Sequence, residues 1–164
     1  MKLLPDLEAD GNIVRSAWDR MSKVPGGKFL FSRALGRLIP YTGTIKAVVS
    51  ELRPGHATVE MADGPAVRNH LRCVHAIALA NLAELTANIG LAYSMPDDAR
   101  FIVAGMDMTY VKKARGKITA SAGCPVLETS AQADFDLEVS MRDPSGVEVA
   151  RAVVHTRVGP KKTR

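Results

Sequence analysis

The sequence predicts an α+β domain in which an antiparallel sheet wraps round a single buried helix. Residues 75–93 contain no proline and consist mainly of Ala and Leu, as expected of a helix that is buried on nearly every side. Residues 133–142 alternate between apolar and polar side chains, a pattern typical of a strand with one buried face. The turn sequence Asp-Pro-Ser-Gly at 143–146 predicts that this strand forms a hairpin with the next.

Residues 1–40 are predicted to form a helical extension of this domain. Apolar residues recur at helical spacing in two stretches, 14–21 and 31–38, which two glycines separate. We expect Trp18 to anchor the first helix. Pro40 is expected to end the second, because proline interrupts helical hydrogen bonding.

The sheet is predicted to contain six strands, two before the buried helix and four after it. Residues 41–53 are rich in Thr, Val and Ile, and residues 56–61 alternate after a short turn. Later strands are expected at 101–112, 117–124, 133–142 and 147–158. The sheet domain would thus span 41–158, with a basic tail at 159–164. Because the open edges of such a sheet need covering, we expect a homodimer or a homotetramer built as a dimer of dimers.

Size and composition are those of an ordinary globular protein. Of the 164 residues, 46% are hydrophobic and 24% are charged, which fits one domain with a substantial core. No apolar run reaches membrane-spanning length and the first residues do not resemble a secretory signal, so we expect a cytoplasmic protein with no membrane partner. Cys73 and Cys124 fit a reducing compartment, although one disulfide between them is possible.

Much of the formal net charge of +5 comes from two places, residues 112–117 and the C-terminal tail that includes Arg157. Basic patches attract nucleic acid, membrane surfaces or phosphorylated small molecules, or are simply solvated. Only 5% of the residues are aromatic and no nucleic-acid recognition motif is present. A nucleic-acid partner is therefore the least favoured of these possibilities.

Polar groups around the start of the buried helix indicate a possible catalytic site. Asn69 and His75 lie in the loop that leads into the helix, where the N–H groups of Ala76 and Ile77 are among the unpaired donors. Glu84, nine residues after His75, is the single charged residue of the helix. Thioester hydrolysis needs such parts: donors that polarise the carbonyl, and a carboxylate that activates water or attacks the carbon.

This segment resembles the hot-dog thioesterases of the phenylacetate-pathway (PaaI) type. Those proteins carry an Asn, a His-Gly-Gly six residues later, and an Asp or Glu nine residues after the His. Asn69, His75 and Glu84 keep both spacings. Residues 107–116 resemble the family's strand that ends in Tyr-x-Arg/Lys-Pro-Ala-x-Gly. The resemblance covers roughly residues 40–158 and implies the hot-dog fold and hydrolysis of an acyl-CoA, with no cofactor other than the CoA of the substrate.

The resemblance also implies a role for each residue. Glu84 would be the general base or nucleophile, Asn69 would position water or the thioester, His75 would order the loop, and the Ala76 amide would donate to the oxyanion. The substrate-binding residues would be Ile77, Thr109, Tyr110, Lys112, Lys113 and Arg115, of which the last three would meet the CoA phosphates. The site would form between two subunits. Outside the resemblance, we expect the apolar faces of Phe31, Leu35 and Leu38 in the second N-terminal helix to cap the acyl channel.

Two departures from the family motif favour a second interpretation. Ala76 and Ile77 replace the two glycines, so a branched side chain stands where the family has none, and Lys113 replaces the usual proline. These changes leave the expected fold intact but weaken the case for catalysis. They motivate the alternative of a non-catalytic acyl-CoA or fatty-acyl binding protein. A dehydratase on the same fold is a further alternative, which Asn69 and Glu84 fit less well.

The same residues allow structural interpretations too. Asn81, Glu84 and Asn88 have the spacing of a single wet helix face.

A metal or thiol site at the loop is also conceivable. His70, Cys73 and His75 are possible metal ligands, but a fourth ligand at a typical spacing is absent, so no metal is expected. Cys73 could be a nucleophile with His75 as its base, although a strand-like Cys-x-His pair points to opposite sides.

Overall fold

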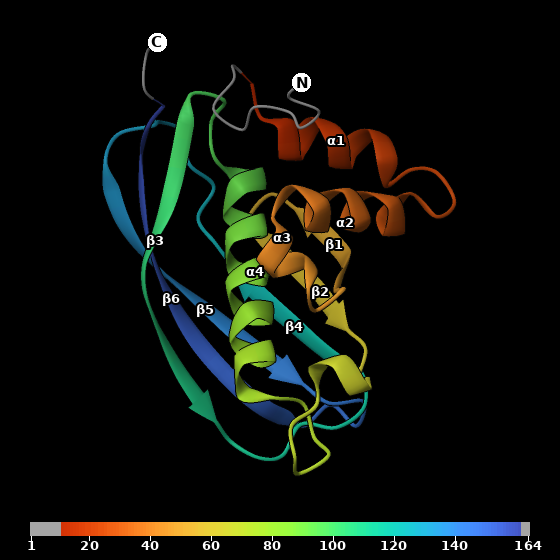
Figure 1. The fold of residues 1–164 in the computed structure, drawn as a ribbon. Coiled ribbons are helices and arrows are strands. Elements are labelled where there is room, and N and C mark those ends of the chain that lie inside the picture. The colour runs from red at the N-terminus through yellow and green to blue at the C-terminus, as the bar shows by residue number, and fades with distance from the viewer. Residues whose placement is uncertain (1–10, 162–164) are drawn as a thin grey trace.

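The computed structural model of the chain describes residues 11–161 (Figure 1). Its helices are α1 (Ile13–Met21), α2 (Gly27–Leu38), α3 (Pro40–Gly43), the 3-10 turn η1 (Pro65–Val67) and α4 (Ala76–Ser94). Its strands are β1 (Val48–Arg53), β2 (His56–Met61), β3 (Ala99–Tyr110), β4 (Ile118–Gly123), β5 (Ala133–Arg142) and β6 (Glu148–Pro160). All six form one antiparallel sheet in the order β1-β2-β4-β5-β6-β3, which confirms the predicted α+β fold.

Helix α4 is the centre of the fold. Figure 1 shows it lying against one face of the sheet, with β3 curving past its side. Fifteen of its 19 residues are buried, as its composition predicted. At Gly90 the sheet approaches so closely that a Cβ atom would lie 3.2 Å from the Cβ of Ala57. Among the described residues, α4 is long and apolar enough to cross a membrane, but its burial is that of a core helix.

The strands bury alternate side chains against α4. In β5, Leu137, Val139 and Met141 are at most 2% exposed, whereas Glu138 between them is exposed. The turn after β5 joins it to β6, and the N–H of Asp143 donates to the carbonyl of Val147 there. The alternation and the hairpin predicted for this segment are both confirmed.

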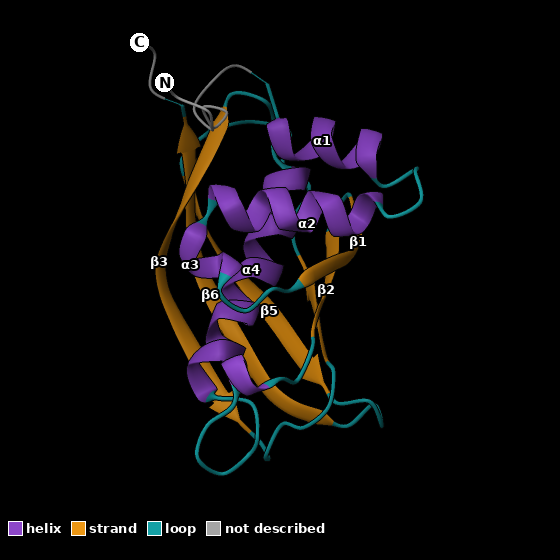
Figure 2. Cartoon of the chain, turned by 45° about the vertical axis from the view of Figure 1, so that its right-hand side comes forward, coloured by secondary structure: helices purple, strands orange, loops and turns teal. Residues whose placement is uncertain are grey.

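The N-terminal helices cover the same side of the sheet as α4, and Figure 2 shows α1 and α2 lying side by side there. The ring of Trp18 in α1 meets that of Phe31 in α2 edge-to-face, with centroids 5.2 Å apart and planes at 75°. Both side chains are buried, so Trp18 anchors α1 as expected. Residues 1–10 of the predicted extension and 162–164 of the predicted tail lie outside the described residues.

Helix α1 also closes the C-terminal end of α4. The side chain of Asn12 caps α1 by accepting from the N–H of Arg15, and its Nδ2 donates to the carbonyl of Ala92 at 2.6 Å. The guanidinium of Arg15 donates to the carbonyls of Tyr93 and Met95. Asn12 and Arg15 therefore satisfy the carbonyls of Ala92 and Tyr93 in the last turn of α4.

The strand predicted at 41–53 is shorter than expected, and the chain first makes the helical turn α3. Pro40 opens this turn at a position where its fixed φ suits a helix. The carbonyl of Tyr41 then accepts from the Nδ2 of Asn81 in α4, at 3.1 Å. This contact with a distant segment overrides the local preference of the Thr residues for strand, so β1 begins only at Val48.

Candidate active site

The loop before α4 is ordered by Asn69. Its Oδ1 accepts hydrogen bonds from the N–H groups of Leu71, at 2.9 Å, and Cys73, at 3.4 Å. Its own backbone N–H donates to the carbonyl of Cys73 at 2.9 Å. Arg72 at the tip has a left-handed φ of 55°, which such a tight turn imposes on it. Asn69 thus shapes the loop, and its Oδ1 is already engaged within it.

His75 is the N-cap of α4. Its backbone is extended, and its Nδ1 accepts a hydrogen bond from the N–H of Ile77 at 3.1 Å. One of the two predicted oxyanion donors is therefore occupied by the chain's own histidine. The N–H of Ala76 has no hydrogen-bond partner within residues 11–161. This donor therefore stays available for a ligand.

Tyr110 ties the C-terminal end of β3 to this helix start. Its hydroxyl donates to the carbonyl of Ala76 at 3.2 Å. Partial burial raises the pKa of the Tyr110 phenol above its ordinary value, so the group remains a donor. Ile77 is 54% exposed next to it, and Thr109 is exposed as well.

Glu84 lies in the middle of α4 and is half-buried. It lines a groove of about 1050 Å³ together with Asn88 of the same helix. The first part of β3 and the last part of β6 also line the groove, as do Leu35 and Leu38 of α2. Phe31 is absent from this lining and packs against Trp18 of α1 instead, and the capping of an acyl channel by α2 stays a prediction.

Asn81 and Asn88, the polar neighbours of Glu84 on α4, do not form a solvent-exposed helix face. Asn81 is 6% exposed and donates to the carbonyl of Tyr41. Asn88 is 9% exposed and accepts from the hydroxyl of Thr156 at 3.2 Å. Both amides are committed to internal hydrogen bonds, whereas Glu84 has no hydrogen-bond or ion-pair partner within residues 11–161. The carboxylate faces the groove uncompensated.

Within one chain the two halves of the predicted site do not meet. Nine residues separate His75 from Glu84, which corresponds to about 13 Å along a helix axis. Asn69, His75 and Ala76 are also absent from the lining of the groove that holds Glu84. The structure therefore brings the loop residues together at the start of α4 and places the carboxylate elsewhere on the same helix.

The predicted phosphate-binding residues follow β3 and are exposed. Lys112 forms an ion pair with Asp143 at 3.1 Å. The hydroxyl of Ser145 and then Lys112 lower the pKa of Asp143 to about 2, so this carboxylate is charged at neutral pH. Lys113 and Arg115 have no ion-pair partner among the described residues, which leaves two of the three predicted cations available.

The thiol and metal interpretations find no support in the geometry. Cys73 and Cys124 are both free thiols. Cys73, the candidate nucleophile, is buried, and its thiol donates to the Oδ1 of Asn69 at 3.4 Å rather than to His75. In the part of the chain that is described, no three His, Cys, Asp or Glu side chains are placed to share a metal ion.

One group of side chains was missed by the sequence analysis. Arg33, Arg37 and Lys46 line a smaller pocket beside the groove. The spacing of Arg33 and Arg37, one helical turn apart, was the available signal, but nothing local to them indicates Lys46.

Comparison with known proteins places this arrangement in context. Residues 27–158 match a family model described as Domain of unknown function (DUF4442). The crystal structure of a genomics target is 31% identical, with a TM-score of 0.77, over 90% of this chain and 97% of that one. A Pseudomonas aeruginosa protein called a probable thioesterase is 24% identical, with a TM-score of 0.72, over 84% and 97% of the two chains. A Haemophilus influenzae thioesterase is 13% identical, with a TM-score of 0.67, over 80% and 92%.

The likeness to the two thioesterase structures establishes the fold, which is the hot-dog fold that the motif resemblance implied. The PaaI-like subtype stays a prediction. No curated protein matches the chain significantly.

Proposed function

The chain belongs to the family described as Domain of unknown function (DUF4442), and from its fold and candidate site we propose that it hydrolyses acyl-CoA thioesters. The position of Glu84 carries this proposal. The single charged side chain of the buried helix lines a groove of about 1050 Å³. Such a carboxylate can act on the polar head of a ligand whose apolar part is bound. Proteins of the same fold that are called thioesterases support the reaction class.

Two routes are open to Glu84. As a general base it would take a proton from water, whose oxygen then attacks the thioester carbon. As a nucleophile it would attack the carbon itself, and water would then cleave the resulting anhydride. In both routes the carbonyl oxygen becomes an oxyanion that a free N–H group stabilises, and the CoA thiolate leaves.

We propose further that two chains build each site. A base and an oxyanion donor must both reach one thioester, but Ala76 and Glu84 are about 12 Å apart along α4. The Ala76 N–H of one copy would therefore serve the thioester held beside Glu84 of another.

The edge strand β3 offers a way to assemble this site. Its C-terminal end at Tyr110 holds the start of α4, and its N-terminal part, Ala99 to Val103, lines the groove of Glu84. If two β3 edges pair antiparallel about a two-fold axis, the start of α4 in one copy approaches the groove in the other. The protein would then be a homodimer or a dimer of dimers. Lys113 and Arg115, which follow β3, would lie near the CoA phosphates.

The first test is thiol release from short, long and aromatic acyl-CoAs. We expect Glu84→Gln to lower kcat/KM by at least about a hundredfold, because it removes the base or nucleophile while keeping the side-chain shape. Glu138→Gln makes the same chemical change on the exposed face of β5 and should retain the parent rate. Equal rates for the parent and Glu84→Gln would refute the role of Glu84.

The second test addresses the shared site. Ala76→Pro removes the N–H donor at the first residue of α4, where proline suits a helix, and His75 already has the extended backbone that precedes proline. We expect this variant to be as impaired as Glu84→Gln. Refolding the two inactive variants together should restore about a quarter of the parent activity, since half of the dimers would contain one intact site. No recovery in demonstrably mixed dimers would exclude a site shared in this way.

A second candidate function is acyl-CoA binding without turnover. The hydrogen bond from the Ile77 N–H to His75 favours it, because this donor is then withheld from an oxyanion. This candidate predicts calorimetric binding of acyl-CoA with no thiol release from any ester. Turnover that depends on Glu84 would eliminate it.

A further inference from the structure

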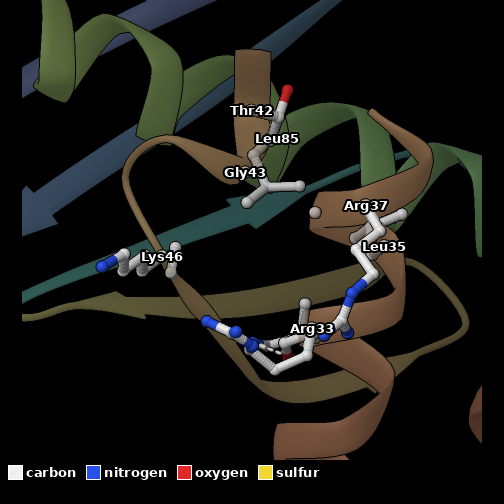
Figure 3. A pocket seen from close by; sticks show the side chains of 11 residues that line it. Arg33, Leu35, Arg37, Thr42, Gly43, Lys46 and Leu85 are labelled. Carbon is white, nitrogen blue, oxygen red and sulfur yellow. Dashed lines mark hydrogen bonds between the residues drawn. The ribbon is translucent and has the colours of Figure 1, made fainter. Parts of the chain in front are cut away.

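A small pocket of about 170 Å³ lies where α2, α3 and the start of β1 meet. Three basic side chains line it: Arg33 and Arg37 from α2, and Lys46 from the segment before β1. Figure 3 shows Arg33 lying between Arg37 and Lys46 along one side of the pocket. The remaining lining is apolar or small, including Leu35 and Leu85.

The positive charge of this pocket is uncompensated. None of its 11 lining residues is acidic. The side chains of Arg33, Arg37 and Lys46 are exposed, and within residues 11–161 none of them has an ion-pair or hydrogen-bond partner. Residues 11–46 contain seven Lys or Arg but only one acidic residue, Asp19. Because like charges one helical turn apart repel, a bound anion would stabilise this arrangement.

Close backbone packing fixes the position of α2 against α3 beside the pocket. Gly36 of α2 and Gly43 of α3 approach so closely that a Cβ on Gly43 would collide with the carbonyl oxygen of Gly36. Lys46 has a left-handed φ of 49°, a conformation that a lysine adopts only where the surrounding structure imposes it. Arg37 lies in the last turn of α2, where a solvated cation is favourable for the helix dipole alone. That explanation does not apply to Lys46, which lies outside any helix.

The small pocket adjoins the groove of Glu84. Leu35, Thr42 and Leu85 line both. Leu85 is also the residue that follows Glu84, so the two spaces open on adjacent positions of α4. The shared side chains place the small pocket next to the groove.

We propose that the pocket formed by Arg33, Arg37 and Lys46 binds an oxyanion of the ligand whose apolar part lies in the groove. Arginine presents paired donors that match carboxylate and phosphate alike. If the proposed function holds, the ligand is an acyl-CoA and the oxyanion has two possible sources. The short span from Glu84 favours a second carboxylate on the acyl group, since a long pantetheine arm separates the CoA sulfur from its phosphates.

The test is calorimetric binding of unreactive ligand pairs that differ in one anionic group. 6-Amino-6-oxohexanoate, whose neutral amide stands in for the thioester, is compared with hexanamide, and 4′-phosphopantetheine with pantetheine. We expect the parent to bind the anionic member of one pair at least about tenfold more tightly, the range of a charge-assisted hydrogen bond. Arg33→Gln/Arg37→Gln should abolish this preference. Arg20→Gln/Lys23→Gln, which removes the same charge from exposed positions outside the pocket, should retain it.

Each outcome either identifies the bound oxyanion or overturns the inference. A preference within the first pair identifies an acyl carboxylate, and one within the second pair a phosphate. No preference in the parent, or one that survives in the pocket variant, overturns the inference. If the double variant unfolds, Lys46→Asn removes a pocket cation outside any helix and suits a left-handed backbone. Because the experiment measures binding, its result does not depend on the proposed hydrolysis. A protein that hydrolyses no thioester can still prefer the anionic ligand.

Discussion

The Nδ1 of His75 accepts a hydrogen bond from the backbone N–H of Ile77 at 3.1 Å, and so caps the first turn of α4. The histidine at the centre of the recognised motif therefore has a structural task inside its own chain. Helix capping by His75 predicts a change in stability, whereas a catalytic role predicts a change in the rate of hydrolysis.

If capping is the main role of His75, His75→Ala should lower the free energy of unfolding by about 1 kcal/mol, the usual effect of losing an N-cap. His75→Asp restores an acceptor to the capping position and should recover most of that loss. Urea denaturation of the three proteins measures it. An unchanged midpoint in His75→Ala would contradict the capping role.

The hydrogen bond from Thr156 to Asn88 is buried between β6 and α4, beside the groove. Thr156→Val keeps the side-chain shape but removes the donor, so the amide oxygen of Asn88 loses its partner. We expect a loss of about 1–3 kcal/mol in the free energy of unfolding. Thr109→Val, at an exposed position of β3, is the matched control and should change stability little.

The outer face of the sheet carries a pH-dependent contact. The ring of His155 contacts Asp136 of β5 at 2.6 Å and Asp107 of β3 at 3.1 Å. Asp136 first and then Asp107 raise the pKa of His155 above its ordinary value.

Because the folded state holds the proton of His155 more tightly than the unfolded chain, the stabilisation is fully present below the ordinary pKa of about 6.5. It is lost as the pH rises through the raised value. Urea midpoints of the parent and His155→Gln should therefore differ most near about pH 5.5 and converge in the alkaline range. His70→Gln, in the exposed loop, should show no such trend. A difference that grows with pH would contradict the assignment.

The contact between Gly36 and Gly43 sets the spacing of α2 and α3. Gly43→Ala forces these backbones apart, and we expect a loss of about 1–3 kcal/mol, as for other overpacked sites. Gly123→Ala adds the same methyl group where no heavy atom lies within 4 Å, and thermal unfolding should move little. Equal stability of the two variants would show that α3 can shift without cost.

Much of the fold was predictable because its signals are local. The helix α4 was recognisable from its composition, and β2 and β5 begin and end where the alternation of side chains placed them. The segment 41–53 was predicted wrongly as continuous strand. Its start forms α3 instead, where Pro40 suits the first helical position and the carbonyl of Tyr41 accepts from Asn81, 40 residues away.

The candidate site was predictable residue by residue, but not as an arrangement. Asn69, His75 and Glu84 stood out by type and spacing. Their spacing did not reveal that the Oδ1 of Asn69 is engaged with Leu71, or that Ile77 donates to His75. These hydrogen bonds depend on the path of the loop backbone, which no periodicity encodes.

The sequence by itself determined which segments form helix and strand, which faces are buried, and that one carboxylate would stand on an apolar helix. Side-chain period and turn residues act over a few neighbours, and burial follows from them. Only the tertiary structure decided that Glu84 faces a groove away from the start of its own helix. It also decided that Lys46 joins Arg33 and Arg37 at one pocket. Those relations arise from contacts between segments far apart in the chain, where the approach of backbones at positions such as Gly36 and Gly43 sets which side chains meet.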